Sequence, residues 1–484
     1  MARSHLVIRR RAVLSWRTMS AGPTAEPTDA PAPPGKPRRA PISLLGLLAL
    51  IFLTVSGGPY GLEPMVSSVG ARATLVLLFL VPLIWSLPVA LMVAELASTL
   101  PLLGGYYRWV RVALGEFWGF QEGWWSWVFT WVDMPLYPAL CGEILRQGWP
   151  LFTGRALSGA ATMAFVLGFI WLAALLNLRG AKFISRYAMV STVAVLTPFV
   201  AFAALAWRQA PAAPTPPHHP LALAGWGLGL STVMWNYCGW DNVATFAPDV
   251  RNPTRNYPLA LVLGVAGITL IYVVPVLAGL HLDPVRAHWQ NGYFVRLAAM
   301  ALGPALAPAV ALIMTLTALL SAWAQYTGQL LYVVPLPLSL AQDGYLPRGL
   351  LQRNRHQVAW RALLLCTVLY SIFAWASFAH LLAADVLLYS AALALEFIAL
   401  WMLRRRVPPL PAPFRIPLPG WRLLPLICAP LGLAAAMFVL AVEQERAFTG
   451  VALGLLASGP VVYWILAAWR SKNRPPAMAY AETA

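Results

Sequence analysis

Long apolar stretches, separated by short polar gaps, occupy most of the chain after residue 41. Each stretch is long enough, or nearly so, to cross the hydrocarbon core of a bilayer, about 30 Å thick, as a helix. There are twelve of them, at residues 42–70, 73–98, 117–145, 156–177, 183–207, 221–247, 257–280, 304–333, 360–378, 381–403, 423–442 and 447–469. The pattern predicts an all-α membrane protein with twelve transmembrane helices.

The composition narrows the class of protein further. Of the 484 residues, 60% are hydrophobic and only 11% are charged, so too few polar side chains remain to cover a water-soluble surface. The net charge of +17 comes from 34 Lys and Arg residues against 17 Asp and Glu. Anchoring of loops in the cytosol explains this excess better than nucleic-acid binding does. The expected partners are therefore the lipid bilayer and a small-molecule substrate.

The basic residues also predict how the chain is oriented. When the N-terminus and every alternate gap are placed on one side, that side holds 27 of the 34 Lys and Arg residues and the other side holds 7. Loops rich in Lys and Arg stay in the cytosol, so both termini are expected there. Residues 1–40 are basic and Pro-rich, which predicts a disordered tail before a membrane domain at 41–470 and a second tail at 471–484. Met1 and Met19 are both possible starts.

Two of the stretches are unlike continuous helices. Residues 56–63 read SGGPYGLE, and three glycines with a proline make an unbroken helix costly there. Residues 233–242 read VMWNYCGWDN, in which Asn, Asp and Gly favour local turns. Unwound backbone inside a bilayer is tolerated only where it lines a protein cavity or water. Both breaks are therefore predicted to face a binding site.

The predicted binding residues are those in the two breaks that offer free backbone groups, aromatic faces or carboxylates to a small charged solute. They are Ser56, Gly57, Gly58, Tyr60, Gly61, Glu63, Trp235, Asn236, Tyr237, Gly239, Trp240 and Asp241. For Glu63 and Asp241 two interpretations stay open: each carboxylate pairs with an ammonium group of the solute, or each caps the half-helix that follows it.

The positions of the two breaks predict an internal repeat. Ser56 and Asn236 lie 180 positions apart, each near the end of the first half of its helix. This spacing predicts two inverted five-helix repeats, at about 42–207 and 221–403, followed by two extra helices at about 423–469. The alternative is that Gly and Pro are simply common in membrane helices.

Further acidic residues lie within the apolar stretches, where a carboxylate is costly and needs a reason. Glu122 and Asp133 lie eleven positions apart, about three helical turns, so they share one helix face, and we assign them to gating or coupling. Glu95 is expected to pair with Arg108 or Arg111. The sequence assigns no role to Glu396.

Several short blocks, in a fixed order along the chain, resemble a known family. They lie at residues 56–63, 95–105, 114–125 (LGEFWGFQEGWW), 177–180, 240–241 with 252–253, 343–347 (DGYLP) and 414–420 (FRIPLPG). The chain resembles the amino acid–polyamine–organocation transporter superfamily, and within it the branch of plant polyamine uptake transporters and L-type amino-acid transporters. The resemblance implies twelve helices, the five-plus-five inverted-repeat fold with broken helices 1 and 6, and alternating-access transport.

The chain departs from the pattern of this family at two places. Residues 335–337 read Pro-Leu-Pro where small polar and basic residues are more usual. Lys182 stands only at the mouth of the stretch at 183–207, whereas some bacterial relatives use a mid-helix lysine for proton coupling. The predicted coupling therefore does not use such a lysine.

The predicted function is that of a permease, a secondary active transporter of amino acids or polyamines, with no catalytic residue, no metal and no cofactor. Coupling to protons through Glu63 or Asp241, or exchange, is favoured over sodium. Thr315, Thr317 and Ser321 offer only a weak sodium signal. The substrate, the coupling ion, the direction of transport and the oligomeric state stay open.

Two other functions are weighed against transport. One is a nutrient sensor that keeps the transporter fold without flux. The other is a membrane-embedded enzyme, which the scattered histidines and the absence of an H-E-x-x-H motif make a poor match. A composition rich in Ala, Pro and Arg suggests a GC-rich bacterial genome and hence the inner membrane of a bacterium.

Overall fold

The computed structural model describes residues 42–100, 105–180, 188–212, 223–243, 250–405, 414–444 and 446–473. Within these ranges the chain is helical, and the one β-bridge recorded pairs Ile42 with Val250. Residues 41–484 cluster as one compact unit. The predicted tail at 1–40 and most of the predicted tail at 471–484 lie outside the described residues.

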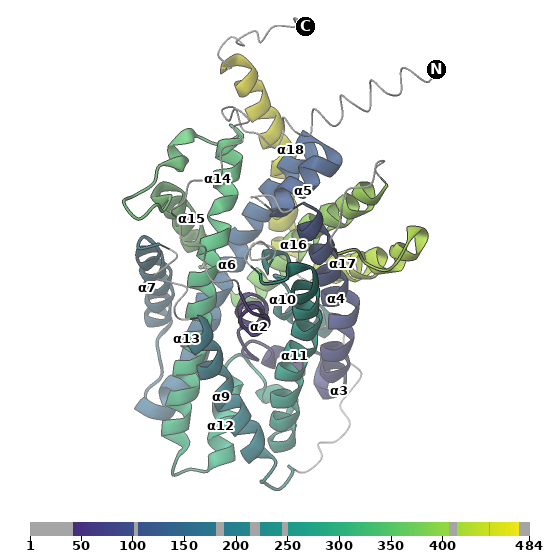
Figure 1. The fold of residues 1–484 in the computed structure, drawn as a ribbon. Coiled ribbons are helices and arrows are strands. Elements are labelled where there is room, and N and C mark those ends of the chain that lie inside the picture. The colour runs from purple at the N-terminus through teal and green to yellow at the C-terminus, as the bar shows by residue number, and fades with distance from the viewer. Residues whose placement is uncertain are drawn as a thin grey trace, which may run out of the picture. The chain divides into compact units, whose positions relative to one another are not determined.

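Figure 1 shows the arrangement of the helices. The first half contains α2 (Leu44–Ile51), η1 (Phe52–Ser56), α3 (Glu63–Val81), η2 (Pro82–Ser86), α4 (Leu87–Thr99), α5 (Gly105–Leu114), α6 (Glu116–Thr153), α7 (Gly159–Asn177), α9 (Ala188–Ala206) and α10 (Leu223–Asn236). The second half contains α11 (Pro253–Leu282), η5 (Arg286–His288), α12 (Tyr293–Leu302), α13 (Ala307–Val333), α14 (Pro335–Gln342), η6 (Arg348–Leu351), α15 (Trp360–Phe373), α16 (Phe378–Arg404), η7 (Gly420–Leu423), α17 (Leu424–Gln444) and α18 (Arg446–Asn473).

Seven helical segments of the described chain are long and apolar enough to cross a membrane, and four shorter apolar helices accompany them. Large apolar side chains point outward from these helices, among them Leu175, Val200 and Ile465, which are more than half exposed. An exposed apolar surface of this kind is stable in contact with lipid. The chain is therefore a multi-pass helical membrane protein.

The ends of the predicted stretches follow local backbone chemistry. Gly70 adopts φ 79° and ψ 165°, which turns the chain between the first and second predicted stretches. Ser377 caps α16 by accepting a hydrogen bond from the backbone N–H of His380. The predicted division at residues 378–381 is therefore a few residues late, because the apolar pattern does not register a capping serine.

The long helix α6 packs against α16, α13, α5 and α7, and α10 packs against α3 and α16. Helix α16 thus contacts both α6 and α10, so it lies beside the helix that leads into the second predicted break.

The expected pairing of Glu95 with Arg108 or Arg111 is wrong. Glu95, at the end of α4, forms a two-pronged ion pair with Arg404 at the end of α16, and it also accepts a hydrogen bond from the N–H of Ile416 at 2.8 Å. Arg108 and Arg111 instead bind Asp343, at the end of α14. The pairing follows from helix packing between segments 309 positions apart, which local sequence does not reveal.

Candidate substrate-binding site

The first predicted break is present in the structure. Helix α2 runs into the single π turn η1 and stops at Gly57, which is left-handed at φ 63°. Gly58 and Gly61 also have positive φ, at 112° and 87°. A Cβ at position 57 would overlap the side chain of Gln325, so only glycine fits there. The chain resumes as a helix at Glu63.

Helix α13 holds the unwound segment in place. The hydroxyl of Ser321 donates to the carbonyl of Gly57. The hydroxyl of Tyr60 donates to the carbonyl of Met314 at 3.0 Å and shares a 2.9 Å hydrogen bond with Thr317. Two of the three hydroxyls considered as sodium ligands thus bind the break itself. The first break and α13 form one hydrogen-bonded unit.

Backbone amides surround the carboxylate of Glu63, which is fully buried. One oxygen accepts the N–H of Gly61 at 2.8 Å, and the other accepts the N–H of Gly292 at 3.1 Å, just before α12. These contacts cap the start of α12 and the turn before α3, rather than amides of the half-helix that follows Glu63, and they tie the first break to α12. Contact between Glu63 and a substrate stays a prediction.

The second predicted break is present as well. Helix α10 ends at Asn236, whose carbonyl accepts a hydrogen bond from Tyr272 at 2.7 Å. Gly239 has φ 91°, and a single 3-10 turn follows at 241–243. Tyr237 donates to the carbonyl of Leu78 at 3.0 Å. The hydrogen bond to Asn236 replaces one that a continuous helix would have made, and that of Tyr237 ties the second break to α3.

Tyr389, on α16, forms hydrogen bonds with two residues of the second break, Gly239 and the buried acid Asp241. Its hydroxyl donates to Asp241 at 2.7 Å and accepts the N–H of Gly239 at 3.3 Å. On the other side of the break, the indole N–H of Trp235 donates to Asp133 at 3.3 Å. Residues at the two ends of the break thus bind buried acids or carry one, while Trp240 donates within the break to the carbonyl of Tyr237.

A small cavity lies beside Asp241. Eight of its eleven lining residues carry polar side chains. The lining comes from α5, α6, the second break, α13 and α16: Tyr106, Ser126, Phe129, Thr130, Asp241, Asn242, Gln329, Val333, Tyr389, Ala392 and Glu396. The cavity measures about 10 Å³, which is room for about one water molecule. The conformation is therefore closed around the site.

Five carboxylates are buried on α6, the second break and α16, and two of them, Asp241 and Glu396, line this cavity; the five are Glu122, Asp133, Asp241, Asp385 and Glu396. The ion pairs recorded among the described residues involve other acids, namely Glu95, Asp283 and Asp343. Within those ranges, no Lys, Arg or His side chain neutralises the five. This arrangement favours a cation or protons as the counter-charge.

The sequence did not assign three residues to the site that the structure adds to it: Asp385, Tyr389 and Gln329. The signal for the first two was a spacing on α16, since Asp385, Tyr389 and Glu396 differ by four and seven positions and so share a helix face. Gln329 binds the hydroxyl of Tyr137 on α6. The predicted pair Glu122 and Asp133 does face this site.

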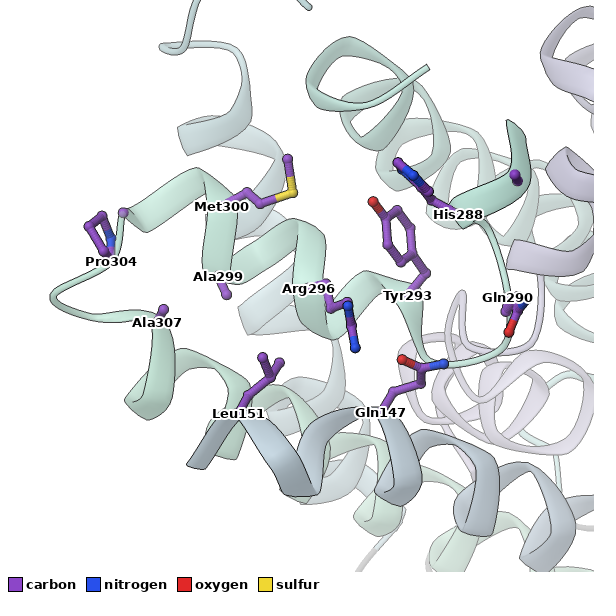
Figure 2. A pocket seen from close by; sticks show the side chains of 12 residues that line it. Gln147, Leu151, His288, Gln290, Tyr293, Arg296, Ala299, Met300, Pro304 and Ala307 are labelled. Carbon is purple, nitrogen blue, oxygen red and sulfur yellow. The ribbon is translucent and has the colours of Figure 1, made fainter. Parts of the chain in front are cut away.

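A second, larger cavity of about 750 Å³ opens between the end of α6 and the connection from η5 to α13. Figure 2 shows Arg296 of α12 directed toward the α6 segment that carries Gln147 and Leu151. None of the predicted binding residues is among its described lining. It neighbours the site through α12, whose first turn binds Glu63.

A helical membrane protein in which two broken segments meet beside a buried polar cavity has the architecture of a solute permease. The family model for amino acid permeases matches residues 42–466, and the chain belongs to that family. This confirms the resemblance derived from the short sequence blocks.

Individual relatives agree with this assignment. Polyamine transporter PUT1 of Oryza sativa subsp. japonica is 32% identical over 437 residues, covering 87% of this chain and 77% of the relative. Polyamine transporter RMV1 of Arabidopsis thaliana is 33% identical over 383 residues, covering 78% and 76%. Branched-chain amino acid permease BcaP of Lactococcus lactis is 26% identical over 341 residues, covering 66% and 72%. These names are those of transporters of polyamines and amino acids and not of enzymes.

Proposed function

We propose that this chain is a secondary active transporter that moves a polyamine across the membrane by alternating access, with the substrate bound beside Asp241. The observation that carries the proposal is the group of five buried carboxylates, which has no basic side chain beside it among the described residues. Uncompensated carboxylates are costly in a membrane interior, so they favour a cationic cargo or protons.

The first break supports a polyamine over an α-amino acid. The carboxylate of an amino acid would need free amides in this segment. The N–H of Gly57 donates to the carbonyl of Phe52, that of Gly58 to Ser56, and that of Gly61 to Glu63. A polyamine has no carboxylate, and the acids and hydroxyls of the small cavity suit its ammonium groups.

Coupling is proposed to run through the same carboxylates. When a polyamine leaves the closed site, protons would replace its charges on Asp241 and its neighbours, so that import and proton movement are linked. Exchange of one polyamine for another satisfies the same requirement.

The twelve-span count and cytosolic termini form part of this proposal. The plant relatives lend the bacterial inner membrane no support.

The size of the cavity supports alternating access. A space of about 10 Å³ does not admit a polyamine, so helices must separate on one side at a time. The contacts between Glu63 and α12 are the ones that would open toward the larger cavity.

The experiment is uptake of radiolabelled putrescine and spermidine into proteoliposomes that contain the purified chain, with arginine and leucine as competitors. We expect accumulation of polyamines that a collapsed proton gradient abolishes, or that requires internal polyamine if the protein is an exchanger. Accumulation of leucine without polyamines would overturn the substrate assignment. Binding of polyamines without any flux would favour the sensor.

A further inference from the structure

We infer that Asp385 and Asp133 form a second ammonium subsite, distinct from Asp241, through which the protein selects triamines over diamines. This inference rests on the proposed polyamine transport. It begins from Asp385, a fully buried aspartate on α16 to which neither the sequence analysis nor the closed cavity gave a role.

Four of the five acids form two layers along the helices α6 and α16. On α16, Asp385, Tyr389 and Glu396 share one face. This face packs on α6, where Glu122 lies within electrostatic range of Glu396 and Asp133 lies within electrostatic range of Asp385.

Asp241 is within electrostatic range of both layers, through Glu122 and through Asp133. Asp133 is fixed by the indole of Trp235, and Asp241 is fixed by the hydroxyl of Tyr389.

The oxygen atoms of these acids point to a missing partner. Both carboxylate oxygens of Asp385 lack a hydrogen-bond partner among the described residues, as does one oxygen each of Glu122 and Glu396. Buried polar atoms in proteins nearly always have a partner. A carboxylate with four unused acceptor positions, completely removed from solvent, fits an ammonium group, which brings up to three donors.

The spacing of the layers fits one class of polyamine. Eleven residues of α-helix rise about 16 Å, so Asp385 and Glu396 differ by that length along α16, and so do Asp133 and Glu122 along α6. A triamine with three- and four-carbon spacers extends about 11 Å between its end nitrogens in a staggered chain. With a charge-assisted contact of about 3 Å at each end, it spans both layers.

A four-carbon diamine is too short to contact both layers. Its two nitrogens lie about 6 Å apart, so it reaches Asp241 and one layer but not the other. Loss of the layer at Asp385 should therefore weaken triamine binding and leave the diamine bound through Asp241 and Glu396.

The experiment measures inhibition of putrescine uptake by unlabelled putrescine, spermidine and spermine for the wild type and for Asp385→Asn. We expect the inhibition constant for spermidine to rise about tenfold or more, while that for putrescine stays within about threefold. Ser390→Ala is the matched control, because this residue lies on the same helix and its hydroxyl bonds only the carbonyl of Val386. It should leave both constants unchanged.

Several results would overturn the inference. Equal losses for diamine and triamine, or no loss for either, would mean that Asp385 is not a length-selective subsite. If Asp385→Asn does not yield folded protein, Asp133→Asn tests the same layer from α6 and must show the same selective loss. A wild type that moves no polyamine would refute the proposed function itself, whereas normal polyamine uptake with unchanged selectivity in both variants refutes only the subsite.

Discussion

Gly239 and the carbonyl oxygen of Thr54 lie so close that a Cβ added at position 239 would be 3.0 Å from that oxygen. Thr54 belongs to the turn before the first break, and Gly239 is the left-handed residue of the second break. The second break therefore lies directly against the turn that leads into the first break. Their contact depends on the absence of a side chain at one position.

Gly239→Ala should disrupt this contact. Alanine is strained at φ 91°, and its methyl group would press on Thr54. Together these effects should cost about 1–3 kcal/mol. We expect a lower melting temperature in detergent and a loss of uptake. Gly267→Ala, within α11 and with nothing within 4 Å of its added Cβ, is the control and should melt at or above the wild-type temperature. Equal melting of both variants would contradict the close approach.

Glu63→Gln separates the two interpretations of Glu63. Glutamine has one acceptor oxygen, so either Gly61 or Gly292 loses its acceptor, at a cost of about 1–3 kcal/mol. If Glu63 is a cap, melting temperature and transport rate fall while the ratio of putrescine to spermidine affinity is unchanged. A stable variant with a selective loss of polyamine affinity would instead indicate direct contact with the substrate.

Much of this site could be predicted from local sequence, and some could not. The two breaks are predicted by Gly and Pro in 56–63 and by Asn, Gly and Asp in 233–242, because the backbone preferences of these residues act locally. Asp385 gave no such signal: it stands alone in an apolar stretch, and its importance arises only where α16 faces α6. The partner of Glu95 was missed for the same reason, since Arg404 is distant in sequence and adjacent only after packing.

The ion pair of Glu95 with Arg404 should stabilise the end of α16. Both side chains are largely buried, so Glu95→Gln leaves the guanidinium without a counter-charge and should cost about 3 kcal/mol. Arg405→Gln is a matched control, because this neighbouring arginine is exposed and only stacks on Trp401. Thermal melts should show a large drop for the first variant and little change for the second. The reverse order would refute this assignment.

Asp283, which follows the end of α11, predicts a pH dependence of stability. Burial raises its pKa, but hydrogen bonds from Tyr293, His288 and the N–H of Val285 outweigh that effect and leave the pKa below its ordinary value. A depressed pKa in the folded state stabilises the protein above the unfolded pKa of about 3.9, and this stability is lost as pH falls through the folded value.

The test compares melting temperatures of the wild type and Asp283→Asn between neutral and acid pH. At neutral pH the wild type should melt at a higher temperature than Asp283→Asn. This difference in melting temperature should shrink as the pH falls below about 4. A difference that is constant with pH would show that the carboxylate charge plays no part.

The most direct test of the central claim is equilibrium binding of spermidine to the purified protein and to Asp241→Asn, with Tyr389→Phe as the variant that keeps the acid but removes its hydrogen bond. If the buried acids hold the cation, spermidine binds the wild type, binding to Asp241→Asn is at least about tenfold weaker, and Tyr389→Phe lies between the two. Unchanged spermidine affinity in Asp241→Asn would contradict the account.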